Sequence, residues 1–93
     1  MTFELEYVDA VLKEDIPKLS KSAKKNIKTA IERKLLYKPE IYGKPLRRSL
    51  KGYRKLRVEN YRVIFRIQGK TIKILIIQHR SKVYKHSTVR IVE

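Results

Sequence analysis

Three strand-like runs in quick succession decide the fold, and they lie in residues 53–80, YRKLRVENYRVIFRIQGKTIKILIIQHR. The middle run alternates with a period of two, which is typical of a β-strand with one buried face. Strands this close in sequence are normally neighbours in one sheet. The stretch therefore predicts an antiparallel meander: a strand at residues 53–58, a turn at 59–60, a strand at 61–67, a turn at 69–70 and a more fully apolar strand at 72–78.

One amphipathic helix dominates the N-terminal half. From Ile16 onward the apolar residues recur every three or four positions, and lysines fill the other faces. Ser20 or Ser22 is the expected N-cap, and Pro39 should end the helix by Lys38. The apolar stripe consists of Leu19, Ala23, Ile27, Ala30, Ile31 and Leu35.

The remaining segments complete an α+β domain. Residues 2–7 alternate apolar and polar side chains and predict the first strand, and a shorter helix at 9–14 makes a helical hairpin with the main helix. Residues 39–52 hold two prolines, two glycines and several cations, which indicates a cationic loop with one short strand near Leu46. Because the helices must cover the apolar face of the sheet, we expect residues 1–93 to form a single two-layer domain.

Charge is the strongest feature of the composition. The 93 residues include 24 Lys+Arg and 9 Asp+Glu, which gives a formal net charge of +15. Such a field attracts polyanions, so the candidate partners are nucleic acid, an anionic membrane or an acidic protein. There is no cysteine, the N-terminus lacks the layout of a signal peptide, and the longest apolar stretch, residues 74–77, is too short to cross a bilayer. We therefore expect a cytoplasmic protein without a membrane segment.

Several kinds of chemistry have no support in the sequence. Two histidines, His79 and His86, with no cysteine and no acidic residue at a ligand spacing, imply no metal site. Three isolated glycines form no phosphate-binding loop, so no nucleotide cofactor is expected. The nine carboxylates are spread out and form no obvious acid/base pair.

A concentration of Arg, Lys, His and Tyr remains in the sheet and the C-terminal tail. Cationic side chains neutralise phosphate and stabilise a pentavalent transition state, and aromatic rings stack on unpaired bases. A ribonuclease needs little else, because the 2′-hydroxyl of the substrate is itself the nucleophile and only a base, an acid and cations must be supplied. We expect RNA contacts from Arg47, Arg48, Lys51, Arg54, Arg57, Arg66, Lys82 and Lys85.

Strand parity selects among these cations. Arg62 and Arg66 point away from the apolar residues of their strand, so they should lie on the sheet face that the helices leave open. Lys55 and Arg57 share one face of the preceding strand. If the two faces correspond, these four side chains form one cationic surface.

Five short motifs stand in a specific order between residues 39 and 84. They are Gly43-Lys44-Pro45-Leu46, residues 50–58 (LKGYRKLRV), residues 61–65 (YRVIF), His79-Arg80 and Val83-Tyr84. Each motif alone is ordinary, but their order and spacing resemble the RelE/ParE superfamily of bacterial and archaeal toxins. The likeness extends weakly over almost the whole chain, since the helical hairpin also fits.

The resemblance implies a sheet packed on two N-terminal helices and a cognate acidic antitoxin that wraps the toxin, seated on an exposed sheet edge or an apolar groove of the helices. For RelE-like members it implies cleavage of messenger RNA in the ribosomal A site, as a metal-independent endoribonuclease. Lys55 would accept the 2′-hydroxyl proton, and Arg62 and Arg80 would stabilise phosphate charge. Tyr84 would stack on a base or protonate the leaving oxygen, and His79 is a further acid/base candidate. We expect the free toxin to be a monomer.

Three functions stay open: a ribosome-dependent endoribonuclease, a ParE-like inhibitor of DNA gyrase, and a non-catalytic basic module that binds RNA or an acidic partner. Some RelE members carry a second lysine where this chain has Tyr53 and an arginine where it has Gln78, which leaves the acid/base pair open. ParE-like members share the scaffold without the catalytic set. The presence of His79, Arg80 and Tyr84 favours the nuclease.

Structural roles compete with catalytic ones at several positions. Tyr53 and Tyr61 are expected to be core or edge aromatics, and His79, directly after an apolar strand, is as well explained by a structural role. His86 has no expected role. Tyr84 is expected in a polar tail, where a packing role for a tyrosine has less support than at Tyr53 or Tyr61.

Overall fold

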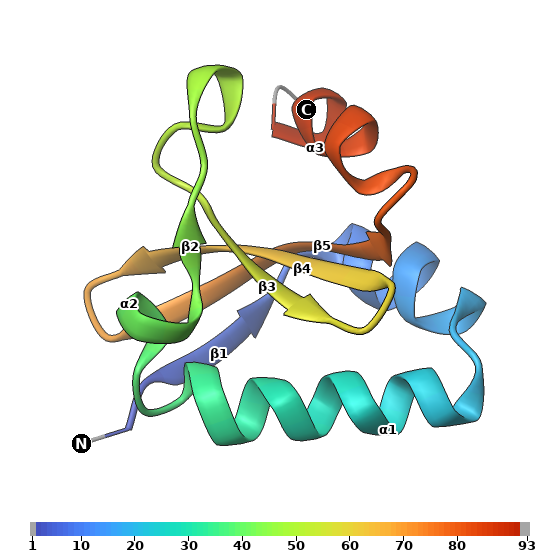
Figure 1. Ribbon diagram of the computed structural model, residues 1–93, viewed down its shortest axis with the longest axis horizontal. Coiled ribbons are helices and arrows are strands. Elements are labelled where there is room, and N and C mark those ends of the chain that lie inside the picture. The colour runs from blue at the N-terminus through green and yellow to red at the C-terminus, as the bar shows by residue number, and fades with distance from the viewer. Residues whose placement is uncertain (1, 92–93) are drawn as a thin grey trace.

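One mixed sheet orders the molecule (Figure 1). The computed structural model describes residues 2–91. In spatial order the strands are β1 (Glu4–Tyr7), β5 (Thr71–His79), β4 (Tyr61–Gln68), β3 (Arg54–Val58) and β2 (Lys44–Pro45). Because β1 and β2 follow each other in sequence but lie at opposite edges, the chain between them must cross the whole sheet.

The predicted meander is confirmed, as is the α+β class. β3, β4 and β5 pair antiparallel, with Arg57 opposite Arg62 and Tyr61 opposite His79. The register between β4 and β5 shifts between Ile64 and Phe65, where Leu75 of β5 has no partner. β1 joins β5 in parallel, which the sequence did not predict, because alternation is the same in either orientation.

A first helical layer covers one face of the sheet. It comprises a π-helical turn η1 (Val11–Asp15), a 3₁₀ turn η2 (Ile16–Lys18), α1 (Lys21–Ala30) and a π-helical extension η3 (Ile31–Leu35). Of the two expected N-caps, the structure selects Ser20, whose Oγ accepts the Ala23 N–H at 3.2 Å. Figure 1 shows α1 running below the strands. No helix within residues 2–91 is long and apolar enough to span a membrane.

The core on this face follows the predicted stripe. Ala23, Ile27, Ile31 and Leu35 are buried at intervals of four residues. Opposite them on the sheet lie the buried side chains of Leu56, Val58, Val63, Phe65, Ile72, Ile74 and Ile77.

The second face of the sheet is also covered, by a helix that the sequence did not predict. α3 (Val83–Ile91) replaces the expected polar tail, and its Val83 packs on Ile64, Leu75 and Ile76. The expectation that this face stays open was therefore wrong over its apolar part. β5 carries apolar side chains on both faces, and burial of the second set requires a second cover.

The segment predicted as a loop holds more structure than expected. The long helix ends at Leu35, before the expected limit of Lys38, and Pro39 begins a short helix, α2 (Pro39–Tyr42). A 3₁₀ turn η4 (Arg48–Leu50) follows β2. A Cβ atom at Gly43 would overlap the Phe65 ring, so only glycine allows the chain to pass this closely.

A buried ion pair joins the two layers at the edge of β5. Arg90 of α3 donates to both carboxylate oxygens of Asp15, at 2.6 and 3.2 Å, and Asp15 is only 2% exposed. Asp15 also accepts the Ile77 N–H at 2.9 Å, and Arg90 also donates to the Leu75 carbonyl at 3.0 Å. The pairing of β1 with β5 ends at Tyr7, which lies opposite Ile74. Beyond that point the ion pair supplies hydrogen-bond partners for the backbone of β5.

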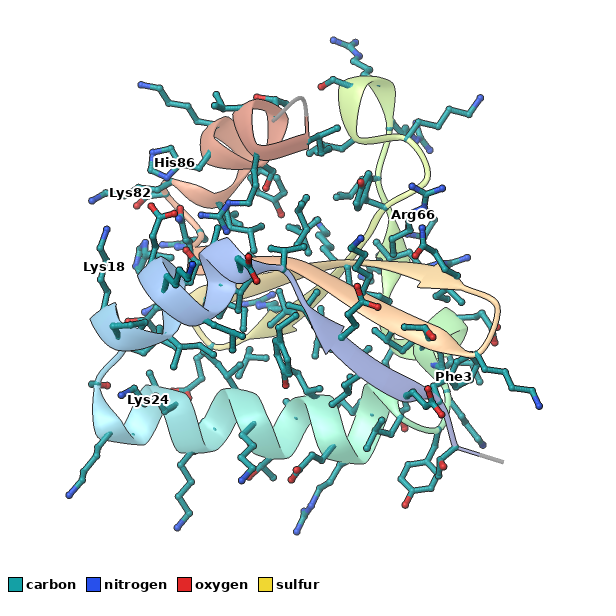
Figure 2. The ribbon with its side chains drawn as sticks, turned by 180° about the vertical axis from the view of Figure 1, so that it is seen from behind. Phe3, Lys18, Lys24, Arg66, Lys82 and His86 are labelled. Atoms are coloured by element: carbon teal, nitrogen blue, oxygen red, sulfur yellow. The ribbon has the colours of Figure 1, made fainter. Side chains whose placement is uncertain are left out.

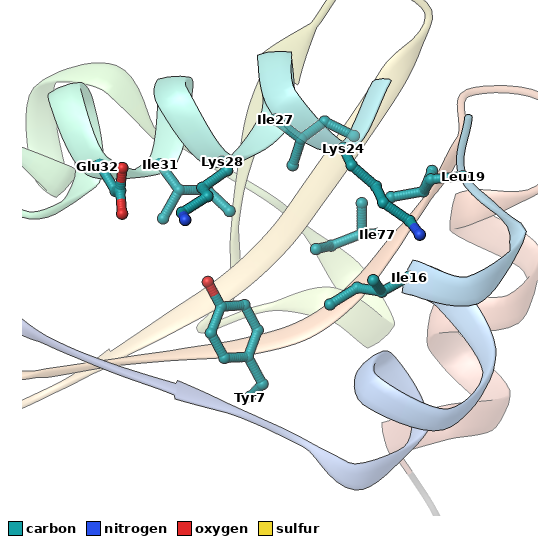
Figure 3. A pocket seen from close by; sticks show the side chains of 9 residues that line it. All are labelled: Tyr7, Ile16, Leu19, Lys24, Ile27, Lys28, Ile31, Glu32 and Ile77. Atoms are coloured by element: carbon teal, nitrogen blue, oxygen red, sulfur yellow. The ribbon is translucent and has the colours of Figure 1, made fainter. Parts of the chain in front are cut away.

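An apolar cavity of about 310 Å³ lies between α1 and the sheet. Figure 3 shows the Tyr7 side chain directed from β1 toward the helix, below Ile31 and Glu32. Burial, and secondarily the charge of Glu32, raise the pKa of the Tyr7 hydroxyl above its usual value of about 10.

Replacing Arg90 by methionine should lower the free energy of unfolding by about 3 kcal/mol, because Asp15 would stay buried without its counter-charge. Urea denaturation of Arg90→Met measures the loss. The matched control is Arg33→Met, at an exposed position of η3, which should change stability by less than about 0.5 kcal/mol. Equal losses in the two variants would contradict a special role of the pair.

Stability should decline at alkaline pH partly through Tyr7. Its pKa is higher in the folded than in the unfolded chain, so its contribution is complete below about pH 10 and is lost as the pH rises toward the folded pKa. Tyr7→Phe should flatten the fall in unfolding free energy above pH 10, whereas Tyr37→Phe, at an exposed position, should leave it unchanged. Parallel pH profiles for Tyr7→Phe and the native protein would rule out this contribution.

Candidate active site

The β3–β4 turn holds Arg62. Its Nη1 donates to the backbone carbonyls of Glu59 and Tyr61, at 2.9 and 2.8 Å. Glu59 adopts a left-handed conformation, with φ of 54°, and its side chain accepts a hydrogen bond from Asn26 of α1 at 2.7 Å. The guanidinium is therefore oriented by backbone atoms of a turn that is tied to the helical layer.

Helix α3 brings Tyr84 to the sheet. The Nζ of Lys55 on β3 lies 5.8 Å from the centroid of the Tyr84 ring, a cation–π distance. The two residues are far apart in sequence, and only the docking of α3 on Ile64 and Ile76 joins them. Tyr84 is thus not in a polar tail but on the first turn of a helix.

All five predicted catalytic residues line one open cavity. It has a volume of about 480 Å³, and its walls come from β3, β4, the end of β5 and α3. A smaller hollow of about 160 Å³, which also involves Arg57, Tyr42 and Lys44, shares two of its residues. The larger cavity is lined by Lys55, Arg62, His79, Arg80, Ser81 and Tyr84.

His79 is an exposed side chain with a defined orientation. Its Nδ1 accepts the backbone N–H of Ser81 at 3.2 Å and lies 2.9 Å from the Ser81 Oγ. Because a backbone N–H can only donate, Nδ1 is the acceptor, and the neutral ring carries its proton on Nε2. The ring also stands edge-on to Tyr61, with 5.8 Å between centroids. His79 can therefore present an N–H donor to the cavity.

The site is cationic. Lys55, Arg57, Arg62 and Arg80 line the two joined hollows, and no carboxylate is among their lining residues in the part of the chain that the structure describes. On β3 and β4 this grouping follows the predicted strand parity. Such a surface can hold a phosphate and stabilise negative charge that develops on it. Within residues 2–91 no three His, Asp or Glu side chains gather at a spacing that would hold a metal ion.

Other cations proposed for RNA contact lie elsewhere. Arg54 faces α2 and donates to the carbonyls of Gly43 and Glu40, at 2.9 and 3.4 Å, so it stabilises that turn. Arg66 lies 5.9 Å from the centroid of Tyr53 and outside the cavity. Lys82 lines a different cavity. The remaining cations are exposed: Lys85 lies on α3, and the segment between β2 and β3 carries Arg47, Arg48 and Lys51.

Asp15, Gln78 and His86 were missed by sequence reasoning. They form a hydrogen-bonded chain: Gln78 donates to Asp15 at 3.0 Å, and His86 Nδ1 lies 2.6 Å from the Gln78 Oε1. A lone aspartate between two helical turns carries no signal of this role, because its partners are more than 60 positions away in sequence.

Comparisons with known proteins agree with this architecture. A family profile described as the ParE toxin of the type II toxin–antitoxin system parDE matches residues 5–84. The toxin–antitoxin complex RelBE2 from Mycobacterium tuberculosis is similar, with 28% identity and a TM-score of 0.76 over 86% of this chain and 100% of that chain. No curated protein sequence matches.

Two further solved structures share the fold. A mutant of the toxin RelE from E. coli in the free state has a TM-score of 0.73 and 22% identity over 98% of this chain and 99% of that one. The RelB–RelE antitoxin–toxin complex from Methanococcus jannaschii has a TM-score of 0.65 and 23% identity, over 87% and 96%. Fold and family match together define a toxin of a type II toxin–antitoxin system, within the RelE/ParE superfamily. The chain belongs to the ParE toxin family.

Proposed function

We propose that this toxin is an endoribonuclease that cleaves messenger RNA on the ribosome. The observation that carries the proposal is the convergence of Lys55, Arg62, His79, Arg80 and Tyr84 on one open, cationic cavity. These side chains supply the three things that cleavage by 2′-hydroxyl attack needs: cations, a proton acceptor and a proton donor.

The reaction would run as an in-line transfer within the RNA. Neutral Lys55 would take the proton of the 2′-hydroxyl, and the 2′-oxygen would attack the adjacent phosphorus while Arg62 and Arg80 stabilise the extra charge. The bond to the 5′-oxygen would break, and that oxygen would receive a proton from His79 Nε2 or the Tyr84 hydroxyl. The products would be a 2′,3′-cyclic phosphate and a 5′-hydroxyl.

The open shape of the site supports dependence of cleavage on the ribosome. The cavity is open and offers cations but few groups that could hold an RNA strand in a single reactive geometry. Catalysis depends on such positioning, and a particle that already holds the message can provide it. The net charge of +15 favours association with ribosomal RNA. We place the protein in the cytoplasm for the same reason.

An acidic antitoxin is the proposed regulatory partner. Similar solved structures are toxin–antitoxin complexes, and a chain of charge +15 has strong electrostatic complementarity to an acidic protein. We propose that the toxin free of its antitoxin is a monomer.

Gyrase inhibition is the second candidate, because the matching family is that of the ParE toxin. It requires no catalytic cavity. A supercoiling assay with purified gyrase separates the two: inhibition of gyrase by a protein that leaves messages intact would replace the nuclease proposal.

Primer extension on a defined message in a purified translation system tests the nuclease. Native protein should produce discrete cuts only when ribosomes are present, and Arg62→Ala should lower the cleavage rate about 100-fold or more. Tyr84→Phe keeps the ring beside Lys55 and removes the hydroxyl, so a loss of about 100-fold would assign proton donation to Tyr84, and little loss would assign stacking.

Arg33→Ala serves as the control, since Arg33 is exposed on η3 and lines neither hollow. The native rate is expected for it. Cleavage that survives in Arg62→Ala, or is lost equally in Arg33→Ala, would remove the cavity from the mechanism.

A further inference from the structure

A second polar cavity adjoins the candidate active site. It has a volume of about 260 Å³ and lies between η2, the end of β5 and the start of α3. His79 lines both cavities, so the two are neighbours. Figure 2 shows Lys18 of the N-terminal helical layer beside Lys82 and His86, near the start of α3.

The lining combines an apolar floor with a cationic rim. Leu19, Tyr61 and Ile77 are buried or half-buried, whereas Lys18, Lys82 and His86 are exposed. The lining also includes the carboxylate of Asp15, whose charge is compensated by Arg90. Glu14 lies outside, in an adjoining hollow that Lys18 and His86 also line. Flat apolar contacts below and cations above fit a nucleobase with its phosphate.

Gln78 adds a means of recognising the base edge. Its amide nitrogen must face Asp15, because a carboxylate only accepts, and its Oε1 then accepts from His86 Nδ1. Both ends of the amide are therefore fixed. Within residues 2–91 one amide hydrogen and one lone pair of Gln78 are left, which together match a donor and an acceptor on the edge of a base.

We propose that this cavity is a nucleotide subsite, which holds the nucleotide next to the one that is cut. The phosphate lies on Lys18 and Lys82, and the base lies over Leu19 and Tyr61 with its edge toward Gln78. The inference rests on the proposed nuclease function, and it assigns that enzyme a contact by which it selects among RNA sequences.

Binding of single-stranded RNA, measured by fluorescence anisotropy, tests the subsite. The probe is a 2′-O-methyl RNA oligomer, which has no free 2′-hydroxyl and cannot be cut by the proposed reaction. Lys18→Ala/Lys82→Ala should weaken binding about tenfold and reduce the slope of log affinity against log salt by about 0.7 for each phosphate contact that is lost. The control, Lys21→Ala/Lys25→Ala, removes the same charge from exposed positions of α1 outside the cavity and should change affinity less than about twofold.

Equal weakening by the two pairs would overturn the subsite, because only general attraction to the charged surface would remain. The binding assay needs no cleavage, so the two proposals can fail separately. Native protein that cuts messages while both lysine pairs behave alike leaves the nuclease and removes the subsite. Selective weakening by the Lys18/Lys82 pair without any cleavage keeps a nucleotide site and removes the nuclease.

Nuclear magnetic resonance locates the contact directly. On titration with cytidine or adenosine 5′-monophosphate, the side-chain amide of Gln78 and the ring of His86 should shift together, and at lower concentration for the preferred base. Shifts confined to the cavity of Lys55 and Tyr84, or the same shifts with inorganic phosphate alone, would contradict recognition of a base at Gln78.

Discussion

A buried ion pair takes the place of a strand along the outer edge of β5. β1 ends opposite Ile74, and the edge beyond it would expose unpaired backbone groups beside the core. Asp15 accepts the Ile77 N–H and Arg90 donates to the Leu75 carbonyl, while the two charges neutralise each other. One residue comes from the N-terminal helical layer and the other from α3, so the same contact closes the sheet and ties together the layers on its two faces.

The apolar character of β5 on both faces makes that second layer necessary. Ile77 faces the core under α1, whereas Leu75 and Ile76 face α3. Docking of α3 places Tyr84 beside Lys55 and directs His86 toward Gln78. Both the candidate active site and the adjoining cavity therefore form where α3 covers β5. Loss of α3 from the sheet would change the geometry of both.

The candidate site was predictable in the places where chemistry follows local geometry. Alternation along two strands separated by a tight turn put Lys55, Arg57 and Arg62 on one face, because the turn determines the register. Strand parity also grouped Arg66 with them, but Arg66 lies against the Tyr53 ring, outside the cavity. Arg54 was expected to contact RNA because of its charge alone, but the backbone carbonyls of Gly43 and Glu40 accept its hydrogen bonds. His79, Arg80 and Tyr84 were selected through a family resemblance rather than by any pattern in the residues themselves.

The sequence by itself determined the meander, the amphipathic helix with a serine cap at Ser20 or Ser22, and the cationic character of the surface, because alternation, helical periodicity and net charge can be read from the residues themselves. Only the tertiary structure decided the parallel pairing of β1, the docking of α3 and the burial of Asp15 with Arg90. These features join residues that are distant in the chain. Their free energy depends on which apolar surfaces leave water together and on whether each buried charge finds its partner, which no local pattern records.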